Sequence, residues 1–387
     1  MKAVFVLPSD PYRPKPVLRA LREADSLSRA GWDVAFICWT REATAELLDS
    51  GPYPVQNVIA AVPELGSSLL GRALAYNRVT RALERTIAQA NADVLIPHDL
   101  PVLRAAVHLK RTQGVPVLFD CHENWPVLVA ENSRIEAVLT DWQERSLGRY
   151  VDHLLIPCEP VARKFRARGI PTTVILNSRP AMEVRRADRS ESRRQLGYIE
   201  SDFVLGYAGA LAPGRGLELL LDAVSTLDPS VKLLIIGGPE QYRDNLRRRA
   251  TDLGIQDRAR LVGYQPFGAL SHFYASMDMG AILLDRRPNH LTALPNKLFD
   301  YLAHGVPVLV PDYPAMASVV QESGAGTTLQ DVDATAIREA IIELRDRRSD
   351  LRAMGERGRQ AFLERFSWDK QEQVFLGVLK GIFNAAR

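Results

Sequence analysis

Short apolar runs alternate with amphipathic stretches through the first half of the chain. Residues 3–7 and 33–38 are continuous apolar runs, which predict strands buried on both faces. Between them, apolar positions recur at helical spacing from Val17 until Gly31 ends the helix. Further strands are expected at 94–96, 116–119, 153–156 and 174–176, and helices at 69–90, 102–111 and 135–147. This alternation predicts a parallel, doubly wound sheet.

The alternation stops in a polar segment and then starts again. Residues 178–194 (SRPAMEVRRADRSESRR) are rich in arginine and nearly free of large apolar side chains, which predicts a solvated linker. Strands are then expected at 203–207, 231–236, 259–262, 278–283, 307–310 and 326–329, and helices at 217–227, 241–253, 296–304 and 368–383. We therefore expect an α/β chain of two Rossmann-like, doubly wound parallel-sheet domains, facing each other across a cleft.

The predicted boundaries divide the chain into four parts. They are a first domain over residues 1–178, a linker over 179–194, a second domain over 195–366 and a helical tail over 367–387. A length of 387 residues suits two domains better than one.

Composition and charge narrow the class of protein. A hydrophobic content of 46% and a charged content of 25% are typical of a soluble globular protein. The net charge of +3 predicts no nucleic-acid partner, although it suits anionic substrates or peripheral contact with a membrane. No apolar run is long enough to span a bilayer, and the N-terminal apolar segment is too short for a signal sequence. We therefore expect a cytoplasmic protein. Peripheral association with the inner face of the membrane is left open. The three cysteines, Cys38, Cys121 and Cys158, predict reduced, buried thiols.

A glycine-rich loop is the first candidate site. In doubly wound sheets, ligands bind beyond the carboxyl ends of the strands. Gly209, Gly214 and Gly216 lie between a predicted strand and a helix, where glycine lets backbone N–H groups approach a diphosphate. Arg215 adds a positive charge. Because the loop matches neither GxGxxG nor a P-loop, it gives little support to a dinucleotide or ATP site.

Two strand ends in the first half carry histidine and carboxylate side chains. His98 and Asp99 follow one predicted strand, and Asp120, His122 and Glu123 follow the next. They are either functional groups or ordinary hydrogen-bonded loop residues. The sequence shows no nucleophile elbow, no metal-ligand cluster and no acidic pair spaced for Mg²⁺ after a strand, so it predicts no metal site.

Residues 287–312 (RPNHLTALPNKLFDYLAHGVPVLVPD) form the second candidate site. We expect a polar loop, a helix over 296–304 that ends at Gly305, and a buried strand. A helix N-terminus offers free N–H groups and a partial positive charge to an anion. Lys297 and, one turn later, Asp300 lie inside this helix. The alternative is an ordinary αβ unit in which these two side chains form a solvated pair.

Together these motifs resemble the retaining, nucleotide-sugar-dependent glycosyltransferases of family 4, which have the GT-B fold. The resemblance extends over essentially the whole chain and rests on the segments PHDLPVL, VLFDCHENWP, YAGALAPGRGLELLLDA, LPNKLFDYLAHGVPVLV and FSWDKQ. It implies transfer of a sugar from a UDP- or GDP-sugar to a hydroxyl acceptor, with retention of configuration and without metal or other cofactor. It leaves glycan, lipid-linked and small-molecule acceptors open, and it implies that the final helix returns to the first domain.

The resemblance also implies roles for individual residues. His122 would hydrogen-bond the donor sugar, Arg215 and Lys297 would neutralise the departing diphosphate, and Asp300 would bind the ribose in place of the usual glutamate. Further donor contacts would come from Gly209, Gly214, Gly216, Thr292, Ala293, Leu294 and Asn296. The acceptor side would include Arg13, His98, Asp99 and Glu123.

Two positions depart from the family pattern. Thr292 replaces a frequent glutamate, and Ala210 replaces a frequent arginine.

Two other functions therefore stay open. A nucleotide-sugar 2-epimerase would share the donor site but would need further acid and base carboxylates around the sugar. A non-catalytic sugar-nucleotide-binding subunit would need only the donor site.

Overall fold

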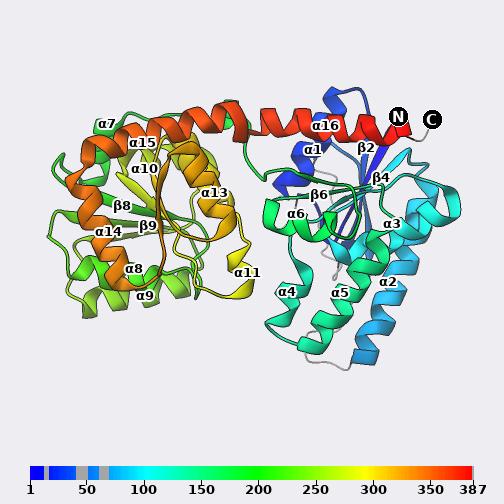
Figure 1. The fold of residues 1–387 in the computed structure, drawn as a ribbon, viewed down its shortest axis with the longest axis horizontal. Coiled ribbons are helices and arrows are strands. Elements are labelled where there is room, and N and C mark those ends of the chain that lie inside the picture. The colour runs from blue at the N-terminus through cyan, green and yellow to red at the C-terminus, as the bar shows by residue number, and fades with distance from the viewer. Residues whose placement is uncertain (13–16, 41–50, 61–68, 386–387) are drawn as a thin grey trace. The chain divides into compact units, whose positions relative to one another are not determined.

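The computed structural model describes residues 1–12, 17–40, 51–60 and 69–385 (Figure 1). Contacts within the chain define two compact units. Unit 1 comprises Met1–Leu176 together with Glu372–Arg387, and unit 2 comprises Asn177–Gln371. Both ends of the chain therefore belong to unit 1.

Unit 1 is built on parallel strands. They are β1 (Lys2–Leu7), β2 (Asp33–Thr40), β3 (Val55–Ile59), β4 (Val94–Pro97), β5 (Leu118–Asp120), β6 (His153–Ile156) and β7 (Thr172–Val174). β1 pairs with both β2 and β4, and two isolated parallel bridges, Leu95 with Val117 and His98 with Asp120, join β4 to β5. The spatial order is therefore β3-β2-β1-β4-β5-β6-β7. This order places β1 and β4 centrally, and it brings the ends of β4 and β5 side by side.

Helices cover the strands of unit 1. They are α1 (Leu18–Arg29), α2 (Leu69–Gln89), α3 (Leu100–Gln113), α4 (Trp125–Ala130), α5 (Arg134–Gly148), α6 (Glu159–Arg166) and most of α16 (Trp368–Ala385). The Phe383 ring of α16 lies 5.5 Å from the Trp32 ring, and Glu372 forms an ion pair with Arg29 of α1. These contacts attach the last helix to the first βαβ unit. Among the described residues, no helix combines the length and the apolarity that crossing a membrane demands.

Unit 2 contains one parallel sheet. Its strands are β8 (Phe203–Ala208), β9 (Val231–Ile236), β10 (Ala259–Val262), β11 (Met279–Ala281), β12 (Val308–Pro311) and β13 (Gly326–Leu329). They pair in the order β10-β9-β8-β11-β12-β13, which is the doubly wound arrangement with the reversal between β8 and β11. The ends of β8, β11 and β12 are consequently neighbours, and the loops after them meet.

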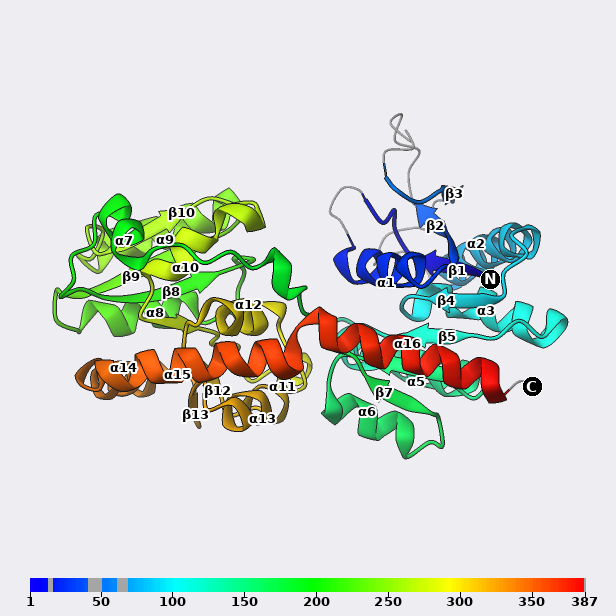
Figure 2. The ribbon, with the colours of Figure 1, turned by 90° about the horizontal axis from the view of Figure 1, so that it is seen from above.

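Helices lie on both sides of this sheet (Figure 2). They are α7 (Arg189–Leu196), α8 (Leu217–Ser225), α9 (Glu240–Asp252), α10 (Ser271–Ser276), α11 (Pro288–Leu291), α12 (Asn296–His304), α13 (Pro314–Ser323), α14 (Ala334–Asp346) and α15 (Arg348–Ala361). Short helical turns occur at Ala181–Glu183, Phe267–Ala269 and Phe362–Phe366. The core between β8, β9 and α8 includes Leu205, Leu217 and Leu233, none of which is exposed. The predicted pair of doubly wound parallel sheets is confirmed.

One strand was absent from the sequence-based prediction. Within the described segments, β3 (Val55–Ile59, VQNVI) is an edge strand that pairs only with β2, and none of its residues is fully buried. The prediction relied on continuous apolar runs, which are typical of strands buried on both faces. An exposed edge strand does not produce such a run.

The prediction of a solvated linker over 178–194 is wrong for its second half. α7 begins after Asp188, whose side chain accepts a hydrogen bond from the Glu191 N–H group. Arg193 is only 2% exposed and, like Arg189, forms an ion pair with Asp278. These arginines hold α7 against the rest of unit 2, because guanidinium groups can donate several hydrogen bonds to one buried carboxylate.

The predicted helix over 135–147 is confirmed as α5, but its apolar stripe does not face the core. Ile135, Val138, Leu139 and Trp142 are 66%, 70%, 54% and 67% exposed. Ser133 caps the helix by accepting a hydrogen bond from the Glu136 N–H group. The apolar periodicity therefore predicted the helix correctly, but it did not predict that the apolar face of the helix is exposed.

Candidate functional site

The predicted functional residues that the structure describes fall into one group in each unit. In unit 2 they lie after β8, between α11 and α12, and within α12, and in unit 1 they follow β4 and β5. Arg13 lies outside the described residues.

The glycine-rich loop of unit 2 connects β8 to α8, and its glycines are required by close neighbours. Gly209 has a φ of +143°, and a Cβ atom there would lie 2.7 Å from Lys297 Nζ. Gly216 has a φ of +71°, and a Cβ atom there would lie 2.3 Å from the Leu283 carbonyl oxygen. A side chain at either position would clash and would also adopt an unfavourable backbone conformation. The loop backbone is thus brought against Lys297.

Lys297 and Arg215 place two positive charges beside this loop. Lys297 Nζ lies 3.5 Å from the centre of the Tyr207 ring, a cation–π contact. Burial lowers the pKa of Lys297 well below its ordinary value, and the neighbouring positive charge of Arg215 lowers it further. The negative charge of Asp300 opposes this lowering only in part, and within the described part of the chain neither Lys297 nor Arg215 forms an ion pair. A bound anion beside Lys297 and Arg215 would offset their repulsion and favour the charged form of Lys297.

The start of α12 adds backbone donors to the same region. The helix begins at Asn296 after Pro295, and no described side chain caps it. Thr292, Ala293 and Leu294 form the connection from α11, in which the Ala293 N–H group donates to the His290 carbonyl. The exposed Asn296 is the first residue of the helix. Unpaired N–H groups and the helix dipole at such an end attract negative charge. As predicted, α12 ends at Gly305, which has a φ of +71°.

The alternative of a solvated ion pair between Lys297 and Asp300 is wrong. Asp300 Oδ1 accepts a hydrogen bond of 2.9 Å from Arg179 Nε, and both side chains are largely buried. The Arg179 guanidinium carbon also lies 3.4 Å from the centre of the Phe267 ring. Sequence reasoning missed Arg179 as a partner of Asp300 because 121 positions separate the two residues.

Sequence reasoning also missed a charged group after β11. Arg287 donates two hydrogen bonds to Asp285, and His290 Nδ1 lies 2.7 Å from Asp285 Oδ1. A Cβ atom on Gly214 would lie 2.4 Å from Arg287 Nη2, so this group contacts the glycine-rich loop. The sequence feature that could have identified this group is the position of Asp285 shortly after a predicted strand of the same sheet.

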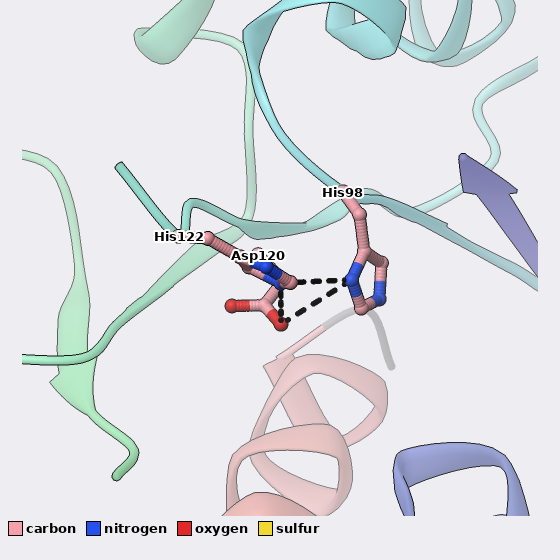
Figure 3. Close-up of side chains that lie close together, drawn as sticks. All are labelled: His98, Asp120 and His122. Atoms are coloured by element: carbon pink, nitrogen blue, oxygen red, sulfur yellow. Dashed lines mark hydrogen bonds and ion pairs between the residues drawn. The ribbon is translucent and has the colours of Figure 1, made fainter. Parts of the chain in front are cut away.

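In unit 1, His98, Asp120 and His122 converge (Figure 3). His122 Nε2 lies 3.0 Å from His98 Nδ1 and 3.1 Å from Asp120 Oδ2. The separation of His98 Nδ1 from Asp120 Oδ2 is 3.6 Å. His98 and Asp120 are almost completely buried, whereas 21% of the His122 side chain is exposed. His122 is therefore the member of this group that another molecule can reach.

Buried charges on α1 extend this network. Arg19 donates two hydrogen bonds to Asp120, of 2.6 and 2.7 Å, and it is 2% exposed. Glu23, which is fully buried, lies 3.3 Å from Arg19 through one carboxyl oxygen and 3.3 Å from His98 through the other. Sequence reasoning missed this pairing, because Arg19 and Asp120 are 101 positions apart.

These charges alter the pKa values of the two histidines in opposite directions. Burial lowers the pKa of His98 to about 3, and the attraction of Asp120 does not outweigh it. Burial also disfavours the charged form of His122, but Asp120 and Asp99 outweigh burial and raise its pKa to about 9. For Asp120, burial is outweighed by Arg19 and His122, which hold its pKa well below the ordinary value. These shifts favour the neutral form of His98 and the charged form of His122 at neutral pH.

Asp99 and Glu123 flank His122 in different ways. Asp99 Oδ1 accepts hydrogen bonds from the His122 backbone N–H group and from Trp125 Nε1. Its backbone has a φ of +65°, which is unusual for a residue other than glycine. Glu123 is exposed, and its carbonyl accepts a hydrogen bond from Cys121. Asp99 therefore orients the His122 backbone, and the structure leaves the Glu123 side chain at the surface.

Both halves of the chain match known protein families. Residues 16–177 match the family described as "Glycosyl transferase 4-like domain", and residues 188–361 match "Glycosyl transferases group 1". The chain is 28% identical over 193 residues to a D-inositol 3-phosphate glycosyltransferase of Nocardia farcinica, covering 48% of this chain and 42% of that protein. It is 26% identical over 249 residues to a GDP-mannose-dependent mannosyltransferase of Corynebacterium glutamicum that acts on a monoacylated phosphatidylinositol monomannoside, covering 61% of this chain and 64% of that protein. The chain thus spans about half the length of the curated relatives it matches.

Solved structures share the fold over the whole chain. Sucrose-phosphate synthase from Thermosynechococcus elongatus superposes with a TM-score of 0.80 at 16% identity, with full coverage of both chains. HepE from Anabaena in complex with UDP gives a TM-score of 0.79 at 18% identity, covering 98% of this chain and 100% of that chain. These similarities extend through both parallel sheets.

Proposed function

Because the chain belongs to the glycosyltransferases of family 4 with the GT-B fold, we propose that it transfers a sugar from a nucleoside-diphosphate sugar to a hydroxyl acceptor, with retention of configuration and without a metal ion. The observation that supports this proposal most directly is the pair of cations, Lys297 and Arg215, beside the glycine-rich loop of unit 2.

The chemistry of the leaving group explains why these cations matter. When the bond from the sugar to the diphosphate breaks, negative charge grows on the phosphate oxygens. Positive groups that are already in place stabilise that charge more in the transition state than in the ground state, and this difference accelerates the reaction. Lys297, Arg215, the N–H groups of the loop and the N-terminus of α12 are such groups. They supply the positive charge that a metal ion provides in other transferases.

The remaining predicted donor contacts follow from the same geometry. We assign the diphosphate to the loop that contains Gly209, Gly214 and Gly216, and the ribose to Asp300, whose carboxylate is oriented by Arg179. Further donor contacts are proposed for Thr292, Ala293, Leu294 and Asn296, and a contact with the donor sugar for His122.

Relatives suggest the base of the donor. Solved HepE complexes contain UDP or UDP-glucose, and the Corynebacterium relative depends on GDP-mannose. We therefore propose a UDP- or GDP-sugar donor. The acceptor carries a hydroxyl group and is a glycan, a lipid-linked molecule or a small molecule.

A ligand screen tests the donor. A ligand that binds only the folded protein raises the melting temperature, by an amount that grows with the ratio of its concentration to its dissociation constant. UDP, GDP and dTDP, each with its sugar derivatives, are compared in a thermal-shift assay. We expect a shift for the UDP or the GDP series. The absence of a shift in all three series contradicts a nucleotide-sugar donor.

Two substitutions test the diphosphate site. Lys297→Ala and Arg215→Ala should each lower turnover, measured as transfer or donor hydrolysis, by about 10²- to 10³-fold, the usual loss when one stabilising donor is removed. Arg247→Ala is the control, because this exposed arginine of α9 pairs only with nearby Asp244 among the described residues. Unchanged turnover in both site variants would contradict the role of these cations.

The same assays distinguish the other two functions. Donor binding without transfer or hydrolysis would favour a non-catalytic binding subunit. Formation of an epimer from UDP-GlcNAc alone, detected by NMR, would favour an epimerase.

A further inference from the structure

The contacts around His122 determine where its protons lie. Arg19 donates to both oxygens of Asp120, so Asp120 is an anion and only accepts hydrogen bonds. His122 Nε2 lies 3.1 Å from Asp120 Oδ2 and must therefore carry a proton. His98 Nδ1 lies 3.0 Å from the same nitrogen and consequently acts as an acceptor.

The proton of His98 then lies on its other ring nitrogen. His98 Nε2 faces a carboxyl oxygen of Glu23 at a distance of 3.3 Å. Burial raises the pKa of Glu23 well above its ordinary value, and the negative charge of Asp120 raises it further, despite the opposing effect of Arg19. These effects favour the neutral form of Glu23.

A count of charges supports a positive charge on His122. With Glu23 and His98 neutral, the anions close to His122 are Asp99 and Asp120, and Arg19 is the cation. A protonated His122 makes this buried group electrically neutral. A neutral His122 would leave an uncompensated negative charge in a largely buried environment, which is costly.

We propose that Arg19, Asp120 and His98 are positioning residues that hold His122 as a cation, with Nε2–H directed into unit 1 and Nδ1–H available to donate a hydrogen bond to an oxygen atom of the donor substrate. The inference rests on the proposed function and specifies the chemistry of the His122 contact. His122 donates a hydrogen bond to the substrate and does not remove a proton from the acceptor. The Oδ2 atom of Asp99 lies 4.0 Å from His122 Nδ1, which is beyond hydrogen-bonding distance.

The roles of the three positioning residues differ. Asp120 supplies the negative charge and accepts from Nε2. Arg19 fixes the carboxylate by a bidentate contact and also donates to the Ile175 carbonyl at 2.7 Å. His98, whose ring centre lies 5.7 Å from that of Phe5 at an interplanar angle of 46°, provides a second acceptor for His122 Nε2.

The experiment is an NMR titration of the full-length protein labelled with ¹⁵N-histidine. The His122 signals are identified as those missing in the His122→Gln variant. We expect His122 to carry protons on both ring nitrogens at pH 7 and to titrate well above pH 7. Asp120→Asn should lower the midpoint of that titration by roughly one to three pH units, the usual effect of removing a neighbouring opposite charge.

Three further variants separate positioning from a loss of folding. Glu23→Gln should leave the His122 midpoint nearly unchanged, because it replaces a neutral acid by a neutral amide of similar shape. His98→Gln should lower the midpoint of the His122 titration less than Asp120→Asn does. If Asp120→Asn does not fold, the same midpoint is measured in His98→Gln instead. The matched control is Glu144→Gln, which breaks a buried ion pair with Lys164 and Arg168 in the same unit and should not move the midpoint.

Kinetics provide the second measurement. In the wild type, kcat should fall as pH rises through the midpoint of His122, and in Asp120→Asn this fall should begin at lower pH. A His122 that is neutral at pH 7, or a midpoint that Asp120→Asn does not change, overturns the inference whether or not the protein is active. If the titration is as expected and no nucleotide sugar shifts the melting temperature, the proposed function fails and the positioning of His122 stands.

Discussion

At the scale of single residues, the protein contrasts two kinds of charged group. Lys297 and Arg215 form no ion pair among the described residues, and they repel each other, so they are suited to an anionic ligand. Arg19 and Asp120, in contrast, satisfy each other inside unit 1. Their effect on a ligand is indirect, because it passes through the more exposed His122.

The protonation of His122 predicts a pH-dependent stability. Its pKa is raised from the ordinary 6.5 to about 9 in the folded protein. A raised pKa contributes stability that is fully present below about pH 6.5 and is lost as pH rises through about 9. The loss in the free energy of unfolding should be about 3–4 kcal/mol at most, since one pKa unit corresponds to about 1.4 kcal/mol.

Urea unfolding of the wild type and of His122→Gln at pH 6.5 and pH 9.5 measures this effect. The difference between the two proteins should shrink at the higher pH. A difference that stays constant with pH would contradict a raised pKa for His122.

At the scale of elements, the same apolar periodicity has two different meanings. Leu103 on α3 is fully buried, whereas Leu139 on α5 is 54% exposed. Both helices show apolar residues at helical spacing, so the pattern alone does not distinguish a core helix from one with an uncovered face. The difference arises from which element packs against each helix.

A matched pair of substitutions tests this contrast. Leu103→Ala should lower the free energy of unfolding by about 2–5 kcal/mol, because it leaves a cavity in the core. Leu139→Ala should change it by less than about 0.5 kcal/mol, as is usual for exposed positions. Denaturant unfolding of both variants measures the two values, and equal losses would show that the α5 face is covered.

At the scale of the whole molecule, unit 1 depends on both ends of the chain. The segment Glu372–Arg387 belongs to unit 1 although the preceding 195 residues, Asn177–Gln371, form unit 2. Phe375, Leu379 and Ile382 of this segment are buried. Unit 1 therefore completes its core only after the rest of the chain has been made.

This dependence predicts the effect of a substitution near the C-terminus. Phe375→Ala should destabilise unit 1 by about 3–5 kcal/mol, the typical cost of removing a buried aromatic ring. Hydrogen exchange should become faster in β1 and β4 and change little in β8 and β9. Faster exchange confined to unit 2 would contradict the assignment of this segment to unit 1.

Much of the fold and part of the candidate site could be predicted from the sequence, because these features depend on local patterns. Continuous apolar runs located β6 and β9 residue for residue, and a glycine after a helical pattern located the end of α12. The glycine-rich loop and Lys297 were recognised because a few neighbouring residues carry the signal.

Only the tertiary structure decided which distant groups meet. Arg19 reaches Asp120, Arg179 orients Asp300, and Lys297 lies on Tyr207 because the order of parallel strands brings their ends together. The protonation of His122 depends on those neighbours, since burial and nearby charge set a pKa. The sequence by itself thus determined the elements and the family, through local periodicity and motifs. The tertiary structure determined the partners of each charge, because residues up to 121 positions apart in the sequence supply them.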